Sequence, residues 1–150
     1  VHLGDTMIFL SVLLLGKKGG AAAAGLGSAL ADLLGGYAAY APWTFLIKAL
    51  MAFIMGAFIE AATKKKKHHV KIGSVPVVEI VGMILAGIEM VIGYAAVDGV
   101  LAGNLWSGIL GAPFNIGQFT VGLVLATILA MALYKTPAKK LFVYRLDEIQ

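Results

Sequence analysis

Long apolar runs alternate along this chain with short joints that are polar or contain Gly and Pro. The apolar runs cover residues 3–15, 19–34, 43–62, 75–101 and 113–134. Each run is apolar throughout, whereas a membrane strand alternates lipid-facing and lumen-facing residues over about ten positions. The pattern therefore predicts five helices. The first two are short for a full crossing at a rise of about 1.5 Å per residue, so we expect them to cross in a thinned or tilted setting, or to extend into their flanks.

The composition assigns these helices to a membrane. Hydrophobic residues make up 60% of the 150 residues, charged residues make up 13%, and the mean hydropathy is +0.91. A soluble domain of this length cannot bury so much apolar side chain, so lipid is the expected solvent. Because a span needs roughly 20 apolar residues, the chain has room for one compact domain of five or six spans. The predicted fold class is an all-α, multi-pass membrane protein.

Lysine and arginine gather on one side of the predicted bundle. They lie in the joint after the first helix, in the joint after the third and beyond the last: Lys17, Lys18, Lys64, Lys65, Lys66, Lys67, Lys71, Lys135, Lys139, Lys140 and Arg145. The joints 35–42 and 102–112 carry neither residue, so the positive-inside rule places the basic side and the C-terminus in the cytoplasm. A metal, nucleic-acid or anionic-lipid site is the alternative interpretation of the run 64–67 with His68 and His69.

The parity of the crossings predicts a further helix. Five crossings that end in the cytoplasm place Val1 outside the cell, although no signal peptide precedes it. We therefore expect an upstream helix before Val1. The whole bundle would then contain six transmembrane helices, of which five are present in this chain, with both ends inside.

Three short motifs resemble those of a known family. They are His2-Leu3-Gly4-Asp5 at the start of an apolar helix, the lysine-bounded turn into the Gly- and Ala-rich run 19–34, and Pro113-Phe114-Asn115-Ile116-Gly117-Gln118 at the start of the last helix. In this the chain is similar to the S components of energy-coupling-factor transporters, in particular the branch assigned to hydroxymethylpyrimidine or pyridoxine and the riboflavin-type relatives.

The resemblance covers essentially the whole chain as helices two to six of a six-helix fold. It implies a substrate-capture subunit, and no enzyme, for a small water-soluble vitamin in the cell membrane. The implied partners are a transmembrane coupling subunit (the T component) and two cytoplasmic ATPase subunits, which would hold ATP and Mg²⁺. It also implies that this chain itself carries no cofactor.

Polar residues inside the spans point to a ligand site in the outer half. Charges in a span are costly and by default mark a functional or paired site. The candidates lie toward the outer end of the third predicted helix, from the middle of the fourth outward, and at the start of the last: Lys48, Glu89, Tyr94, Asp98, Asn115 and Gln118. In the alternative interpretation, Lys48 and Glu89 form a structural ion pair, and the two amides join helices. Asp5 is expected at a loop-to-helix junction, where the positive helix end favours it.

Aromatic residues concentrate on the same outer side. Tyr37, Tyr40 and Trp43 occupy one outer joint, and Trp106 occupies the other beside Asn104. Such residues ordinarily form an interfacial belt. Flat heterocyclic ligands also stack on aromatic rings, so we predict that Tyr40, Trp43, Asn104 and Trp106 belong to the ligand site.

The second helix carries two stripes of small residues. Gly20, Ala24, Ser28 and Asp32 form one stripe, and Ala23, Gly27, Ala31 and Gly35 form the other. Small residues let helix backbones approach closely in lipid. Packing within the bundle is one interpretation, and docking of the membrane partner on Ala23, Gly27 and Ala31 is the other. Asp32 is expected either to contact ligand or to lie among the headgroups.

Catalytic motifs are missing from the sequence. It contains no G-x-x-x-x-G-K-[ST] phosphate loop and no H-E-x-x-H zinc motif, and His68 and His69 lie in a basic run that repels cations. Nucleotide energy must therefore come from a partner. The remaining alternative is a self-sufficient secondary transporter with Glu89, Asp98 or Lys48 as a proton-linked group, although internal repeats of the kind common in that class are not evident.

Overall fold

The computed structural model describes residues 3–65 and 70–144 and is almost entirely helical. In order along the chain, the elements are α1 (Gly4–Leu34), α2 (Ala41–Lys65), β1 (Lys71–Ile72), β2 (Val75–Pro76), α3 (Val77–Ala102), α4 (Leu105–Tyr134) and the 3₁₀ helix η1 (Pro137–Leu141). Four helices in the described part are long and apolar enough to cross a membrane: α1, α2, α3 and α4. The chain is therefore a multi-pass helical membrane protein. The prediction of six transmembrane helices in the whole bundle remains an expectation.

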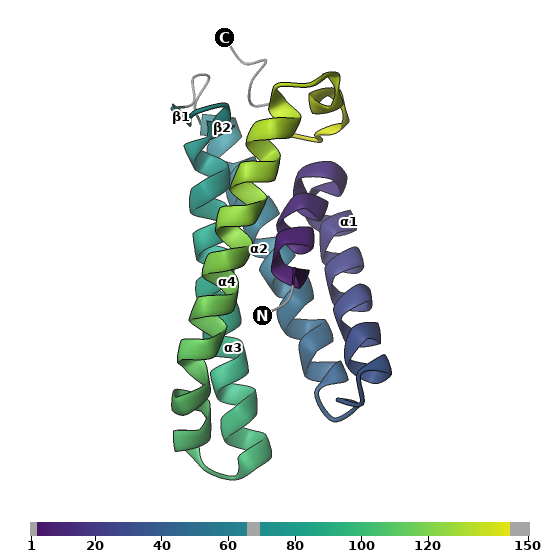
Figure 1. Ribbon diagram of the computed structural model, residues 1–150, viewed down its shortest axis with the longest axis vertical. Helices are drawn as coiled ribbons and strands as arrows, with labels where there is room; N and C mark the ends of the chain where they lie inside the picture. Colours follow the sequence, from purple (N-terminus) through teal and green to yellow (C-terminus); the bar gives the residue numbers. More distant parts are fainter. Residues whose placement is uncertain (1–2, 66–69, 145–150) are drawn as a thin grey trace.

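The helix α1 reverses direction at Gly16. Gly16 has φ 75° and ψ −177° inside an otherwise helical stretch. A side chain is rarely tolerated there, so glycine is required. A Cβ placed on Gly20 would lie 3.0 Å from the Cα of Val12, as expected when the two halves of α1 fold against each other. Residues 4–15 form a short helix that begins about halfway along the bundle, and residues 17–34 run back antiparallel to it (Figure 1).

The two helical segments agree with the first two predicted helices, and the reversal corrects only the joint between them. The sequence suggested two separate crossings at 3–15 and 19–34, with Lys17 and Lys18 in a joint between them. In the structure Lys17 already begins the second half of α1, because a single glycine makes the turn and no loop is needed. The described part of the first half begins about halfway along the bundle (Figure 1).

The last predicted helix begins eight residues earlier than expected. The sequence placed a joint at 102–112 and a helix start at Pro113, but only Gly103 and Asn104 separate α3 from α4. Gly103 ends α3 with φ 69°, and the Asn104 side chain accepts a hydrogen bond of 3.0 Å from the Ser107 N–H at the start of α4. These two caps make a tight turn, so α4 starts at Leu105 and Pro113 lies inside it. The other two predictions, 43–62 and 75–101, correspond closely to α2 and α3.

The two ends of the bundle differ in chemistry. One end, here called the lysine end, carries the β1–β2 hairpin and η1, together with Lys64, Lys71 and Lys135 (Figure 1). The opposite end, called the aromatic end, holds the α1–α2 turn with Tyr37 and Tyr40 and the α3–α4 turn. The hairpin was not predicted. It is antiparallel with Ile72 opposite Val75, and the Ser74 hydroxyl donates a 2.9 Å hydrogen bond to the Met131 carbonyl of α4.

A methionine-rich core joins the helices. Its fully buried members include Phe9, Leu13, Met51, Met55, Met83 and Met90. At the lysine end the chain returns after η1 to the turn in α1, where the Val143 N–H donates a 2.8 Å hydrogen bond to the Leu13 carbonyl. That carbonyl loses its usual helical partner where α1 reverses, so the C-terminal segment replaces it. Lys17 and Glu60 form an ion pair of 2.6 Å close by, and the Tyr144 hydroxyl donates to the same carboxylate at 3.2 Å.

Candidate functional site

A buried ion pair lies where α1, α2 and α4 meet. Lys48 Nζ on α2 is 2.5 Å from Asp5 Oδ1 in the first turn of α1, and the two side chains are 3% and 0% exposed. Gln118 on α4 donates from Nε2 to the other oxygen of Asp5 at 3.1 Å. Lys48 also contacts the sulfur of Met90 on α3 at 2.9 Å. Charges so deeply buried are tolerated only when paired and hydrogen-bonded, and here each charge has both kinds of partner.

The identity of the lysine's partner corrects the sequence analysis. Lys48 was expected to pair with Glu89 if the pair was structural, and Asp5 was expected at a loop junction. The structure pairs Lys48 with Asp5, because the reversal at Gly16 carries the start of α1 back into the bundle. Asp5 is in the first helical turn, as expected, but it is fully buried.

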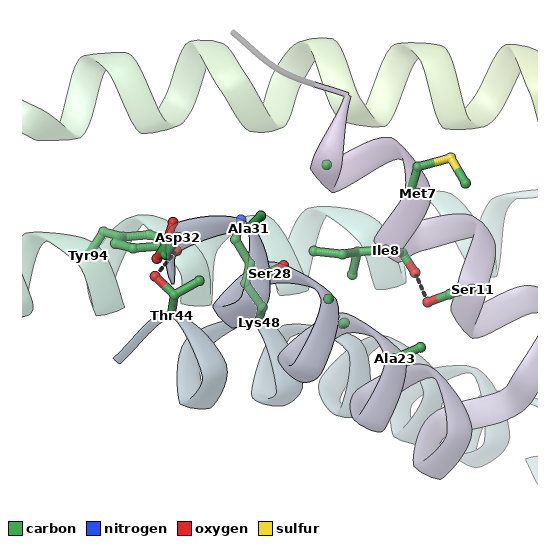
Figure 2. Close-up of a pocket in the computed structure, with 13 residues that line it drawn as sticks. Met7, Ile8, Ser11, Ala23, Ser28, Ala31, Asp32, Thr44, Lys48 and Tyr94 are labelled. Atoms are coloured by element: carbon green, nitrogen blue, oxygen red, sulfur yellow. Dashed lines mark hydrogen bonds between the residues drawn. The ribbon is translucent and has the colours of Figure 1, made fainter. Parts of the chain in front are cut away.

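A cavity of about 380 Å³ opens beside this pair. Its wall includes both halves of α1, and α2 and α3 complete it: Gly4, Met7, Ile8, Ser11, Ala23, Ala24, Gly27, Ser28, Ala31, Asp32, Thr44, Lys48 and Tyr94. Figure 2 shows Asp32, Thr44 and Tyr94 gathered at one end, with Met7, Ile8 and Ser11 toward the other. Most of this wall is apolar, and polar groups converge at one end, which is the usual design of a small-molecule site.

A second cavity of about 300 Å³ continues toward the aromatic end. Its lining is Asp32, Tyr37, Tyr40, Thr44, Tyr94, Asn115 and Gln118. Asp32, Thr44 and Tyr94 line both cavities, so the two are adjacent parts of one site. The site therefore runs from the buried ion pair to the tyrosines of the α1–α2 turn.

Hydrogen bonds hold the rings of this site in place. The Tyr94 hydroxyl donates to Thr44 Oγ1 at 3.1 Å, and Lys48 Nζ lies 5.4 Å from the centre of the Tyr94 ring. The Tyr40 hydroxyl donates to Asp98 Oδ1 at 2.9 Å. This hydrogen bond, together with burial and the carboxylate's charge, raises the pKa of Tyr40, so the phenol remains a donor. Rings fixed in this way present flat faces to a ligand.

The structure brings together about half of the predicted ligand residues. Five of them line the cavities: Tyr40, Lys48, Tyr94, Asn115 and Gln118. Asp98 adjoins the second cavity through Tyr40. Trp43, Asn104 and Trp106 line neither cavity; Asn104 caps α4, and Trp106 is 71% exposed in the first turn of α4. The stretch 102–112, which was predicted to be a joint, is mostly helix, and the assignment of Trp43, Asn104 and Trp106 to the ligand site remains a prediction.

Glu89 lies half-buried on α3 and lines neither cavity. Its Oε2 is buried and has no hydrogen-bond partner within the described residues. Lys48 is close enough for its positive charge to act on this carboxyl, although it is bonded to Asp5. Glu89 is therefore a neighbour of the buried pair and not a member of it.

The small-residue stripe faces the first cavity. Ala23, Gly27 and Ala31 all line it, and a Cβ placed on Gly27 would meet nothing within 4 Å. The close contact of α1 with α2 lies at Gly25 instead, where an added Cβ would be 3.0 Å from the Phe45 carbonyl oxygen. The docking of a partner on Ala23, Gly27 and Ala31 remains a prediction.

Ser28 and Thr44 line the cavities but were not assigned to the site from the sequence, and Asp32, for which ligand contact was one of two interpretations, lines both cavities. Ser28 and Asp32 are four residues apart on α1, and Thr44 and Lys48 are four apart on α2, so each pair shares a helix face. That spacing was the available signal for Ser28, Asp32 and Thr44. Within residues 3–65 and 70–144, His, Asp and Glu form no group of three that could hold a metal ion. His68 and His69, as well as His2 and Arg145, lie outside the described residues.

The chain is similar to known proteins. A family model described as ECF-type riboflavin transporter, S component, matches residues 1–135. A protein of Pyrococcus woesei, described as an uncharacterized protein in a gap 3' region, is 37% identical over 103 residues. That alignment covers 69% of this chain and 62% of the relative's length. No solved structure matches the chain.

Proposed function

Because the chain belongs to the family of ECF-type riboflavin transporter S components, we propose that it captures a small water-soluble vitamin at the outer face of the cell membrane for an ATP-driven importer. An S component is a membrane-embedded substrate-binding subunit and not an enzyme, and the apolar helices α1 to α4 fit that role. The observation that carries the proposal is the cavity pair around Asp5, Lys48 and Tyr94.

The size and lining of the site favour a flat, neutral or weakly charged ring. Cavities of about 380 and 300 Å³ lie at the lower end of the roughly 300–1,000 Å³ usual for small-molecule sites. Tyr94 and Tyr40 supply ring faces, and Thr44, Asn115 and Gln118 supply hydrogen-bonding groups. Riboflavin is the first candidate, since the family description names it. Hydroxymethylpyrimidine and pyridoxine, which the sequence suggested, are smaller rings with similar groups.

The transport cycle requires partners. We propose that a transmembrane T component and two cytoplasmic ATPases, which hold ATP and Mg²⁺, act at the lysine end, while ligand enters from the aromatic end. Two features support this arrangement: the lysines lie at one end, and the cavities extend toward the other. In the membrane, the positive-inside rule then gives a cytoplasmic C-terminus.

Titration of the purified protein in detergent tests the capture function. We expect riboflavin, pyridoxine or hydroxymethylpyrimidine to bind with a stoichiometry of one, measured by isothermal titration calorimetry. Tyr94→Leu removes the ring common to both cavities and should weaken binding roughly tenfold or more, because an aromatic contact and a hydrogen-bonded anchor are lost together. Phe114→Leu is the control, since Phe114 is 82% exposed on α4 and lines neither cavity.

Uptake into liposomes separates this function from a self-sufficient secondary transporter. The chain alone should bind ligand and yet accumulate none when a proton gradient is imposed. Accumulation should require the T component, both ATPases and ATP inside the vesicle. Gradient-driven accumulation by the chain alone would favour the secondary transporter and would reject the importer subunit.

A further inference from the structure

Asp32 is placed at the junction of the two cavities. It lies in the last turns of α1 and lines both cavities together with Thr44 and Tyr94 (Figure 2). Its main-chain carbonyl accepts a 2.7 Å hydrogen bond from the Tyr37 N–H, which fixes the backbone there. The side-chain Oδ2 is buried and has no hydrogen-bond partner within the described part of the chain. A buried carboxylate oxygen without a donor is unfavourable, and such a group in a cavity wall is suited to accept from a ligand.

The charges around the cavities are unbalanced. Among the described residues that line them, Lys48 is the only cation, and Asp5 holds it at 2.5 Å. Within the part of the chain that the structure describes, Asp32 forms no ion pair, and Asp98, which adjoins the second cavity, is bonded to the Tyr40 hydroxyl. The negative charges of Asp32 and Asp98 both act on Tyr94, in the wall that the cavities share, whereas the charge of Asp5 is balanced by Lys48. The lining consequently presents hydrogen-bond acceptors and a negative potential to anything that enters.

On the basis of the proposed function, we propose that Asp32 determines the substrate class of this subunit: vitamins whose hydroxyl, amino or ring N–H groups donate to its carboxylate. A neutral or cationic donor satisfies Oδ2 and gains from the local negative potential. A vitamin that carries a carboxylate would place its anion beside Asp32 without a free cation, at the cost of like-charge repulsion and desolvation. The site thus combines an attractive element for donors with a repulsive one for anions.

The residues around Asp32 make this role specific. Ser28 lies one helical turn before Asp32 on the same wall. Its hydroxyl can donate a hydrogen bond to a ligand hydroxyl or accept one from it. The Thr44 hydroxyl accepts from Tyr94 and is already engaged. Asp32 is therefore the acceptor at this junction that still needs a donor.

The first experiment compares Asp32→Asn with the wild type in detergent, by titration with whichever of riboflavin and pyridoxine binds more tightly. Loss of a hydrogen bond to a charged group should weaken binding roughly ten- to a hundredfold. Because Oδ2 has no hydrogen-bond partner among the described residues, the melting temperature without ligand should stay the same or rise. Glu60→Gln is the matched control: it makes the same chemical change in a carboxylate that is bound by Lys17 and Tyr144 away from the cavities, and ligand affinity should not change.

The second experiment uses the wild type alone, so it does not depend on whether a variant folds. Pantothenate and biotin, which carry carboxylates, should fail to displace the bound riboflavin or pyridoxine at concentrations at which the neutral vitamins compete fully. Equal affinity in Asp32→Asn, or effective competition by pantothenate or biotin, overturns the role of Asp32 and leaves vitamin capture standing. If the wild type binds none of these vitamins, the capture function itself fails, and the proposal for Asp32 fails with it.

Discussion

At the scale of single residues, the pair Asp5–Lys48 connects the fold to the site. It links the start of α1 to α2, Gln118 extends it to α4, and the lysine forms part of the cavity wall. The sequence identified Lys48 as exceptional from the cost of placing a charge inside a span. It could not identify the partner, since Asp5 lies 43 residues away and reaches Lys48 only through the turn at Gly16.

Replacing Lys48 by Met should destabilise the protein strongly. The substitution leaves Asp5 buried without its cation, and breaking a buried pair from one side typically costs about 3–5 kcal/mol. Thermal unfolding in detergent measures the effect. The double variant Asp5→Asn with Lys48→Met should recover much of the loss, because neither charge then remains. If the single variant melts like the wild type, the pair is not the structural element described here.

Replacing Glu89 by Gln should have the opposite outcome. Glu89 has a buried oxygen without a partner in the described chain and lines neither cavity, so removing its charge should leave ligand affinity within about threefold and stability equal or higher. Calorimetry and thermal unfolding on the same preparation check both values. A tenfold loss of affinity in a folded protein would instead place Glu89 in the ligand site, as the sequence predicted.

At the scale of elements, the reversal of α1 determines the architecture. Gly16 allows residues 4–15 to pack against residues 17–34 without a loop, and the C-terminal segment supports the turn through Val143 and Leu13. Without this reversal, neither the Asp5–Lys48 pair nor the first cavity would form, because both halves of α1 contribute to them.

Gly16→Ala should therefore destabilise the protein by about 1–3 kcal/mol, since φ 75° with ψ −177° is a strained conformation for any residue with a Cβ. Gly27→Ala is the matched control: it lies within the regular part of the same helix, and its Cβ meets no atom within 4 Å. It should be neutral or stabilising by up to about 1 kcal/mol. Unfolding by denaturant in micelles compares the two. Equal stability of the two variants would contradict the glycine-dependent turn.

How closely the bounds of each helix were predicted depended on the residues at its ends. The bounds of α2 and α3 were predicted closely, because an apolar run stops there against lysines, glycines or prolines. The start of α4 was missed, since Pro113 resembles a helix start and the true cap at Asn104 depends on one side-chain hydrogen bond. The hairpin β1–β2 has two residues in each strand, which is too short for a period-2 pattern to be read.

At the scale of the whole molecule, the chain is polarised from end to end. The lysines gather at the end with β1–β2 and η1, and the cavities extend toward Tyr37 and Tyr40 at the other. Hydropathy and the lysine pattern were enough to predict a polytopic bundle with polar groups facing inward. They were not enough to predict that Asp5 is buried against Lys48, or to decide between ligand contact and the headgroup region for Asp32, because both depend on how α1 folds back against α2.

Cysteine labelling tests this polarity in the membrane. The chain has no cysteine, so single substitutions at Asn104 and Lys64, both exposed, report without background. In intact cells an impermeant maleimide should label the cysteine at 104 and spare the one at 64, because the lysine end faces the cytoplasm. Labelling at 64 alone would invert the orientation.

The most direct test of vitamin capture is native mass spectrometry of the protein purified from cells grown in rich medium. The wild type should release one neutral, donor-bearing heterocycle per chain. Gly27→Leu should release little or none, because Gly27 lines the first cavity, a Cβ there would meet no atom within 4 Å, and the added side chain would take up ligand space. A wild-type protein that carries no vitamin through a mild purification and binds none when vitamins are added, or a Gly27→Leu variant that retains the same ligand in full, would contradict the assignment of this cavity as the capture site.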